Sequence, residues 1–136
     1  MKKKQMAAHI AELARANGIT IQWSSHRGCA IRATRVVKIR LVCSPITYAI
    51  ALHEIGHFLG PMQRERRLFR EAGAWLWARD NAPVWTDAMS RKMAKCLRSY
   101  ERAYRHRAAR RIGNPPVFPP EGHDFWRLIE LGERLK

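Results

Sequence analysis

The chain has 136 residues, of which 46% are hydrophobic, which is enough for one compact domain with a modest core and too little for two. Its formal net charge is +15 at pH 7, which favours acidic partners such as nucleic acid or an anionic membrane surface, or a well-solvated surface. Charge alone does not choose among these. We therefore expect residues 1–136 to form a single domain.

The cysteines and the apolar stretches exclude several protein classes. Cys29, Cys43 and Cys96 lie far apart and form no CxxC pair, so the sequence indicates neither a disulfide framework nor a thiolate zinc site. We expect three reduced, buried thiols. No stretch approaches the roughly 18 uninterrupted apolar residues that span a bilayer, and His9 and Glu12 interrupt any signal-peptide core. The sequence thus predicts a soluble, cytoplasmic protein with no membrane partner.

The N-terminal third predicts a helix followed by a small sheet. Residues 5–16 carry apolar side chains at helical spacing and end at Asn17-Gly18, a helix stop signal. Runs rich in β-formers follow at 19–23, 29–34 and 36–42. We expect about three strands.

The third of these runs alternates between apolar and basic residues. Val37, Ile39 and Leu41 should face one way, while Lys38 and Arg40 face the other. This pattern predicts a half-buried strand with three core side chains.

At Ser44-Pro45 the pattern changes from strand to helix. Ser44 can accept hydrogen bonds from free backbone N–H groups at a helix start, and Pro45 suits the first helical position. Gly60-Pro61 is a stop signal. The sequence therefore predicts a helix of about four turns over 44–60.

The C-terminal half predicts mainly helices. They are expected at 66–80 and at 83–110, and a proline-rich loop, "GNPPVFPPEG", follows at 113–122. The amphipathic sequence "HDFWRLIELGERLK" predicts a short final helix. The expected fold class is α+β: an N-terminal helix, a small sheet and a helical half, with the core in 19–110.

The helix at 44–60 contains His53-Glu54-Ile55-Gly56-His57, an HExxH motif. Histidines at i and i+4 lie on one helical face and can bind one metal ion, and a hydrolytic zinc site needs three protein ligands and an open position for water. Glu54 follows the first histidine, where its carboxylate can take a proton from the activated water and pass it to the leaving amine. The flanking apolar residues predict a buried helix, on which unsatisfied histidines would be costly.

A third ligand is expected from the helix at 66–80, because a short turn makes it an antiparallel neighbour of the motif helix. Glu71 lies at a height matching His57, and Ala74 and Ala78 continue its face with small side chains that permit close approach, as does Gly56. Glu65 is the competing candidate. It falls in the turn and has the support of neither helix.

These segments resemble a known family. "ALHEIGHFLG" followed by the glutamate of "EAGAWLWA" is similar to the HExxH-then-E-x-x-A-x-x-[FW]-A pattern of gluzincin-type metallopeptidases of the ImmA/IrrE group, small proteins frequent in phages and mobile elements. The resemblance covers residues 36–80 and implies a zincin-like fold. The segment "WTDAMSRKMAKCLRSYERAYRHR" is similar to small proteins of Mu-like phages and prophages, which implies a phage or prophage origin.

Carried over position by position, the resemblance implies that His53, His57 and Glu71 bind Zn²⁺ and that Glu54 is the catalytic base. It further implies that a protein or peptide is the substrate. One position departs from the family pattern, which often has a second acidic residue two places after the ligand glutamate. Here that place is Gly73.

Other aromatic and basic residues leave alternatives open. A group that stabilises the developing oxyanion is required, and the sequence nominates His123, Tyr48, Tyr100 and Tyr104 without deciding, each being equally explicable as a structural residue. Trp75, Trp77 and Trp85 are interpreted as core and helix-packing residues.

The runner-up interpretation belongs to another class of protein. "RHRAARR" at 105–111 and "RERRLFR" at 64–70 would form a phosphate-binding face of a nucleic-acid-associated phage protein with a structural or inactive zinc site. A solvated helix face is the simpler explanation. A third interpretation is an inactive scaffold or host-interaction protein, which would keep the fold and dispense with Glu54. For a peptidase, the strand at 29–34 is a candidate edge for binding an extended peptide.

Overall fold

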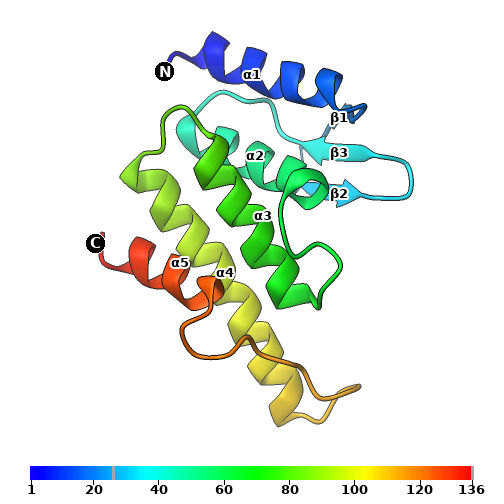
Figure 1. Cartoon of the computed structure of the whole chain (residues 1–136), viewed down its shortest axis with the longest axis vertical. Helices are drawn as coiled ribbons and strands as arrows, with labels where there is room; N and C mark the ends of the chain where they lie inside the picture. The colour runs from blue at the N-terminus through cyan, green and yellow to red at the C-terminus, as the bar shows by residue number, and fades with distance from the viewer. Residues whose placement is uncertain (26, 136) are drawn as a thin grey trace.

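The computed structural model describes residues 1–25 and 27–135, and it has the expected α+β composition (Figure 1). Within these residues there are five helices and one three-stranded mixed sheet. In chain order the elements are α1 (Lys3–Ala16), β1 (Thr20–Trp23), β2 (Cys29–Ile31), β3 (Val36–Ile39), α2 (Pro45–Leu59), α3 (Arg67–Asn81), α4 (Asp87–Ala109) and α5 (Asp124–Glu133).

The sheet has the order β1-β3-β2, with β1 parallel and β2 antiparallel to the central strand. Val37 of β3 is opposite Ile21 on one side and Ala30 on the other. Val37 and Ile39 are buried, as the alternation predicts. β2 therefore lies at an edge of the sheet.

Two of the predicted strands are shorter than expected. The run at 29–34 ends at Ile31, because the chain turns there and reverses into β3. The run at 36–42 ends at Ile39, and the prediction that Leu41 faces the core is wrong: Leu41 is 68% exposed, whereas Val42 is buried. Residues 40–42 lie beyond the end of β3, so the two-residue period of a strand no longer determines which of their side chains face the core.

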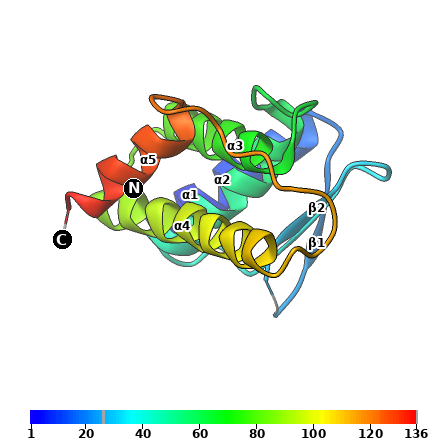
Figure 2. The same ribbon diagram turned by 90° about the horizontal axis from the view of Figure 1, so that it is seen from below.

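Helix α2 is the central element of the fold. It packs against α1, α3, α4, β2 and β3, and it lies between the sheet and the helical half (Figures 1 and 2). The predicted start and stop are confirmed: the Ser44 hydroxyl accepts a hydrogen bond from the Thr47 backbone N–H at 3.1 Å, Pro45 opens the helix and Gly60 caps its end.

Helices α2 and α3 approach each other closely, as the small residues predict. A Cβ atom at Gly56 would lie 2.5 Å from the carbonyl oxygen of Ala74, closer than real contacts allow. At Gly73 a Cβ atom would collide with the carbonyl of Pro61. An acidic side chain at position 73 would therefore have no room.

The remaining helices need one correction. Helix α4 does not begin at Pro83, as predicted, but at Asp87, because Thr86 caps it by accepting a hydrogen bond from the Met89 backbone N–H at 3.2 Å. Residues 113–122 form the expected loop without helix or strand, and α5 follows it.

The core confirms the tryptophan interpretation and corrects the cysteine one. Trp75 is fully buried, and Trp77 and Trp85 pack against the core. The cysteines do not fill the core: Cys29 and Cys43 are exposed and Cys96 is half-buried. None of the helices in the described part of the chain has the length and apolarity that crossing a membrane requires.

Candidate metal centre and active site

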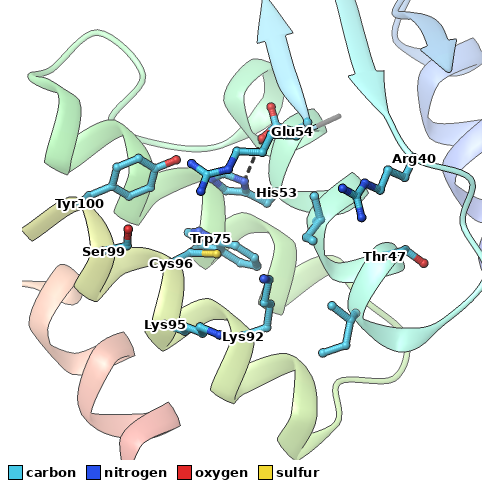
Figure 3. A pocket seen from close by; sticks show the side chains of 14 residues that line it. Arg40, Thr47, His53, Glu54, Trp75, Lys92, Lys95, Cys96, Ser99 and Tyr100 are labelled. Atoms are coloured by element: carbon cyan, nitrogen blue, oxygen red, sulfur yellow. Dashed lines mark ion pairs between the residues drawn. The ribbon is translucent and has the colours of Figure 1, made fainter. Parts of the chain in front are cut away.

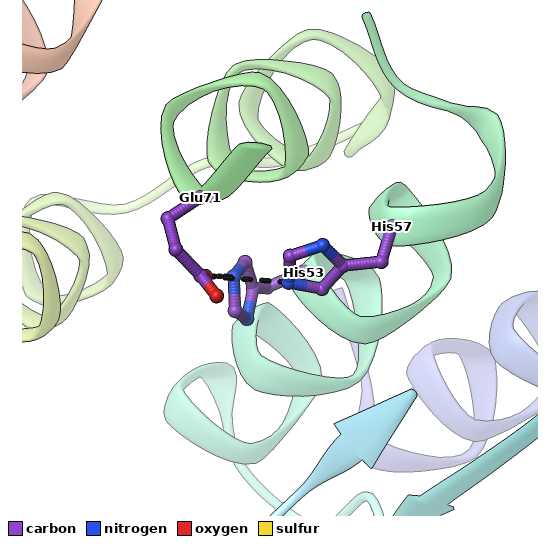
Figure 4. A group of neighbouring side chains, drawn as sticks. All are labelled: His53, His57 and Glu71. Atoms are coloured by element: carbon purple, nitrogen blue, oxygen red, sulfur yellow. Dashed lines mark hydrogen bonds and ion pairs between the residues drawn. The ribbon is translucent and has the colours of Figure 1, made fainter. Parts of the chain in front are cut away.

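The HExxH motif and Glu71 converge across the interface between α2 and α3 (Figure 4). Glu71 Oε2 lies 2.8 Å from His53 Nε2 and 3.2 Å from His57 Nε2. One ligand atom from each of the three side chains lies within 4.8 Å of the others, and the described residues contain no other group of three or more histidine, cysteine or acidic side chains with this geometry.

Two of these three side chains are buried. Only 4% of His53 and 7% of Glu71 is exposed. Burial by itself lowers the pKa of His53, but hydrogen bonds to Glu54 and Glu71 and their negative charges outweigh it and raise this pKa to about 9. Burial raises the pKa of Glu71, and His53 and His57 more than reverse this, so the carboxylate stays ionised.

The donor set fits a zinc ion. Two imidazole nitrogens and one carboxylate oxygen, held on two rigid helices, are a usual ligand set of catalytic zinc and leave a further position open. Both histidines turn the same atom, Nε2, toward the same carboxylate oxygen. The three side chains satisfy one another through these contacts, and it is the convergence of their donor atoms from two helices on one point that favours a shared metal ion.

Gln63 fixes the orientation of His57, and the sequence analysis did not single it out. Its side-chain NH₂ donates to the carbonyl oxygens of Pro61 and Arg70, both at 2.9 Å. Its Oε1 is then left as an acceptor 3.0 Å from His57 Nδ1, so Nδ1 carries a proton and Nε2 is the nitrogen that a metal ion would bind. A glutamine in a turn carries no sequence signal for this role.

Trp75 supports the other histidine. Its ring stacks on His53 at a centroid distance of 4.3 Å with an interplanar angle of 13°. The buried Trp75 Nε1 has no hydrogen-bond partner among the described residues, which costs about 1–3 kcal/mol. Trp75 therefore lowers the stability of the fold through this Nε1 group. The flat Trp75 ring limits the rotation of the His53 ring on which it stacks.

Glu54 lies beside the three converging side chains. Its Oε1 is 3.1 Å from His53 Nδ1, and 6% of the residue is exposed. It borders two cavities, of about 440 Å³ and 370 Å³, and Glu71 borders the second. The competing ligand candidate, Glu65, lies exposed in the turn after α2 and outside this group.

Of the four residues nominated to stabilise an oxyanion, Tyr100 is the one that borders both cavities. Burial raises the pKa of Tyr100, and the charges of Glu71 and Glu54 raise it further, so its hydroxyl keeps a proton to donate. Tyr48 instead contacts His9, with 2.5 Å between the Tyr48 hydroxyl and His9 Nδ1.

The two other nominees have structural roles. The Tyr104 ring packs edge-on against Phe118, with 6.4 Å between ring centroids. His123 caps α5 by accepting a hydrogen bond from the Phe125 backbone N–H at 3.1 Å, and its ring contacts Phe69.

The larger cavity is basic, a feature that the sequence analysis also missed. It lies between α2, α4 and the ends of the strands, and Figure 3 shows His53, Glu54 and Trp75 along it. Its cationic lining residues come from three separate segments: Arg27, Arg40, Lys92 and Lys95. These segments are separated in the sequence, so no local sequence pattern predicts that their cations form a cluster.

No family model, curated protein or solved structure matches this chain. The geometry of the site and the sequence motif therefore carry the functional argument.

Proposed function

We propose that this protein is a zinc-dependent metallopeptidase with a zincin-like fold, related to the gluzincin-type ImmA/IrrE group. The observation that carries the proposal is the convergence of His53, His57 and Glu71 beside the buried carboxylate of Glu54. A chance HExxH string would not require a glutamate from another helix at hydrogen-bond distance from both histidines. Zn²⁺ is the proposed cofactor, with a protein or peptide as substrate.

In the proposed reaction His53, His57 and Glu71 hold the zinc ion, which supplies a polarised, more acidic water when bound. The Glu54 carboxylate takes a proton from the attacking water and then gives it to the leaving amine. The Tyr100 hydroxyl, which borders the same cavities, donates a hydrogen bond to the oxyanion that develops on the carbonyl.

The sheet edge beside the site offers a place for the peptide backbone. β2 pairs only with β3 among the described strands, and Cys29 and Ala30 border the smaller cavity together with Glu54. A Cβ atom at Gly28 would lie 3.2 Å from Glu54 Cγ, so the chain passes close to Glu54 just before β2 begins. An extended peptide adding to β2 would bring a backbone carbonyl near Glu54. A peptide complex with the chain bound elsewhere would refute this mode.

The metal content of the purified protein tests the proposal most directly. We expect about one zinc per chain, because the ligand set is complete for a three-residue catalytic site. His53→Ala and Glu71→Ala should lose the metal, and Glu54→Gln should keep it while abolishing peptide hydrolysis. Absence of zinc after loading would refute the site, whereas zinc without hydrolysis would favour an inactive scaffold.

A nucleic-acid-associated role is the second candidate function. It is favoured by the exposed arginines at the end of α4, Arg107, Arg110 and Arg111, together with the net charge of +15. Salt-dependent binding to duplexes of arbitrary sequence would support it. We place the protein, in either role, in the cytoplasm of a bacterial cell as a phage or prophage product.

A further inference from the structure

The charged side chains that line the larger cavity beside Glu54 are mainly positive. Arg27 precedes β2, Arg40 follows β3, and Lys92 and Lys95 lie one turn apart on α4. None of these four cations pairs with an acidic side chain of residues 1–25 and 27–135. Among the described residues, the lysines and arginines that do form such pairs are Arg15, Arg98, Arg105 and Arg134, so what distinguishes the four cavity cations is that they gather around one recess.

The cavity is a recess with an apolar side. Ile46, Ile50 and Trp75 line it together with the cations, and Figure 3 shows Arg40 and Lys92 on separate walls. Lys92 is half-buried, so its charge is less screened by water than that of a fully exposed lysine. Glu54 is the one carboxylate among the described residues of this lining, and the proposed reaction already uses it.

We propose that this cavity is a specificity subsite for an acidic side chain, so that the preferred substrates are peptides with Asp or Glu next to the cleaved bond. The inference rests on the metallopeptidase function proposed above. The cavity volume of about 440 Å³ has more than enough room for an acidic side chain, its apolar wall can contact the methylene groups, and the cations of the lining can pair with the carboxylate.

The observations favour a peptide over a nucleic acid in this cavity. The four cations surround a recess that borders His53 and Glu54, instead of forming a stripe along the surface. Trp75 is fully buried against His53 and offers no exposed face on which a base could stack. Tyr100, which is half-buried, is then the one Phe, Tyr or Trp of the described lining that a base could reach, whereas single-strand binding uses several aromatic rings in succession. A carboxylate on a flexible side chain fits this geometry better than a phosphate backbone.

Cleavage of a randomised synthetic peptide library by the zinc-loaded protein, read by mass spectrometry, tests the proposal. We expect Asp and Glu to be enriched beside the cleaved bonds by about tenfold over Asn and Gln, and the enrichment to fall at high salt. Lys92→Glu with Lys95→Glu should abolish the enrichment while cleavage of neutral peptides continues. Lys3→Glu with Lys4→Glu, on exposed positions of α1, is the matched control and should change nothing.

The outcomes separate the two proposals. Cleavage without acidic enrichment, or enrichment that survives in the charge-reversed variant, overturns the subsite and leaves the peptidase standing. If the charge-reversed protein melts at a lower temperature than the wild type, Lys92→Gln with Lys95→Gln replaces it in the comparison.

If no peptide is cleaved, the peptidase proposal fails, and binding still decides the subsite. Fluorescence anisotropy of a labelled glutamate-rich peptide and its glutamine twin should then show about tenfold tighter binding of the acidic peptide, lost in Lys92→Glu with Lys95→Glu. Equal binding of the two peptides overturns the subsite. Displacement of the acidic peptide by a single-stranded oligonucleotide that binds more tightly overturns it in favour of nucleic acid.

Discussion

At the scale of single residues, metal binding depends on which nitrogen of each histidine carries a proton. Gln63 settles this for His57, because its NH₂ group is already engaged by two backbone carbonyls and only its oxygen faces Nδ1. A histidine that a neighbouring hydrogen bond holds in the correct tautomer and orientation binds a metal ion more tightly. Gln63 is therefore a positioning residue, although it does not itself belong to the converging group.

Gln63→Ala should weaken zinc binding by about 10- to 100-fold, the usual effect of losing a hydrogen bond that orients a metal-bound histidine. Competition against a chromogenic chelator measures the affinity. Gln22→Ala, at an exposed position of β1, is the matched control and should bind zinc like the wild type. An unchanged affinity in Gln63→Ala would show that packing alone orients His57.

The residues that could be predicted from the sequence are those whose relation is set within one element or between two adjacent helices. The positions of His53 and His57 on one face follow from the helical period. The position of Glu71 opposite them could be predicted because a short turn makes the two helices antiparallel neighbours and places Glu71 level with His57. Gln63 could not be predicted, because its contacts depend on the path of the turn between α2 and α3. The cations of the larger cavity come from segments that only the folded chain brings together.

At the scale of elements, the closest approach of α2 and α3 determines whether Glu71 reaches the histidines. Gly56 makes this possible, since it faces the backbone of Ala74. The small residues and the helix caps were predictable because they act locally. The strand ends were not, because a strand stops where its neighbour stops pairing, as at Ile39, and sequence alternation continued past that point.

Gly56→Ala should lower the free energy of unfolding by about 1–3 kcal/mol, the range for overpacking, because its Cβ atom would lie 2.5 Å from the Ala74 carbonyl oxygen. The sign of this change in the free energy of unfolding tests the close approach of the two helices, because Gly→Ala in an unhindered helix stabilises by about 1 kcal/mol. Urea unfolding of the zinc-free protein measures it without interference from metal binding. Arg102→Ala, on the exposed face of α4, should change stability by less than about 0.5 kcal/mol.

At the scale of the whole molecule, the candidate site and the core share the same interface. His53 and Glu71 join the two central helices while their ligand atoms point at one another. Without metal, a proton on His53 holds the pair together, and in the proposed function a zinc ion would take the place of that proton. The stability of the entire fold should therefore depend on the protonation of His53 and on metal binding at the site.

The pH dependence of stability follows from the His53 and Glu71 pKa values. The pKa of His53 rises from 6.5 to about 9 on folding, so its contribution is fully present below pH 6.5 and is lost as the pH rises through 9. The pKa of Glu71 falls below 4.5, so its contribution is present above pH 4.5 and is lost at lower pH. The chelator-treated protein should therefore be most stable between pH 4.5 and 6.5.

Thermal unfolding of the chelator-treated protein from pH 5 to pH 10 should show a melting temperature that falls as the pH rises through 9. His53→Asn should remove this slope, because the substituted side chain binds no proton in that range. His106→Asn, at an exposed position of α4, should preserve it. Added zinc should raise the melting temperature more strongly as the pH rises toward 9, since fewer protons then compete with zinc for His53 Nε2. A melting temperature that is independent of pH and of zinc would mean that His53 and Glu71 do not couple the metal site to the fold.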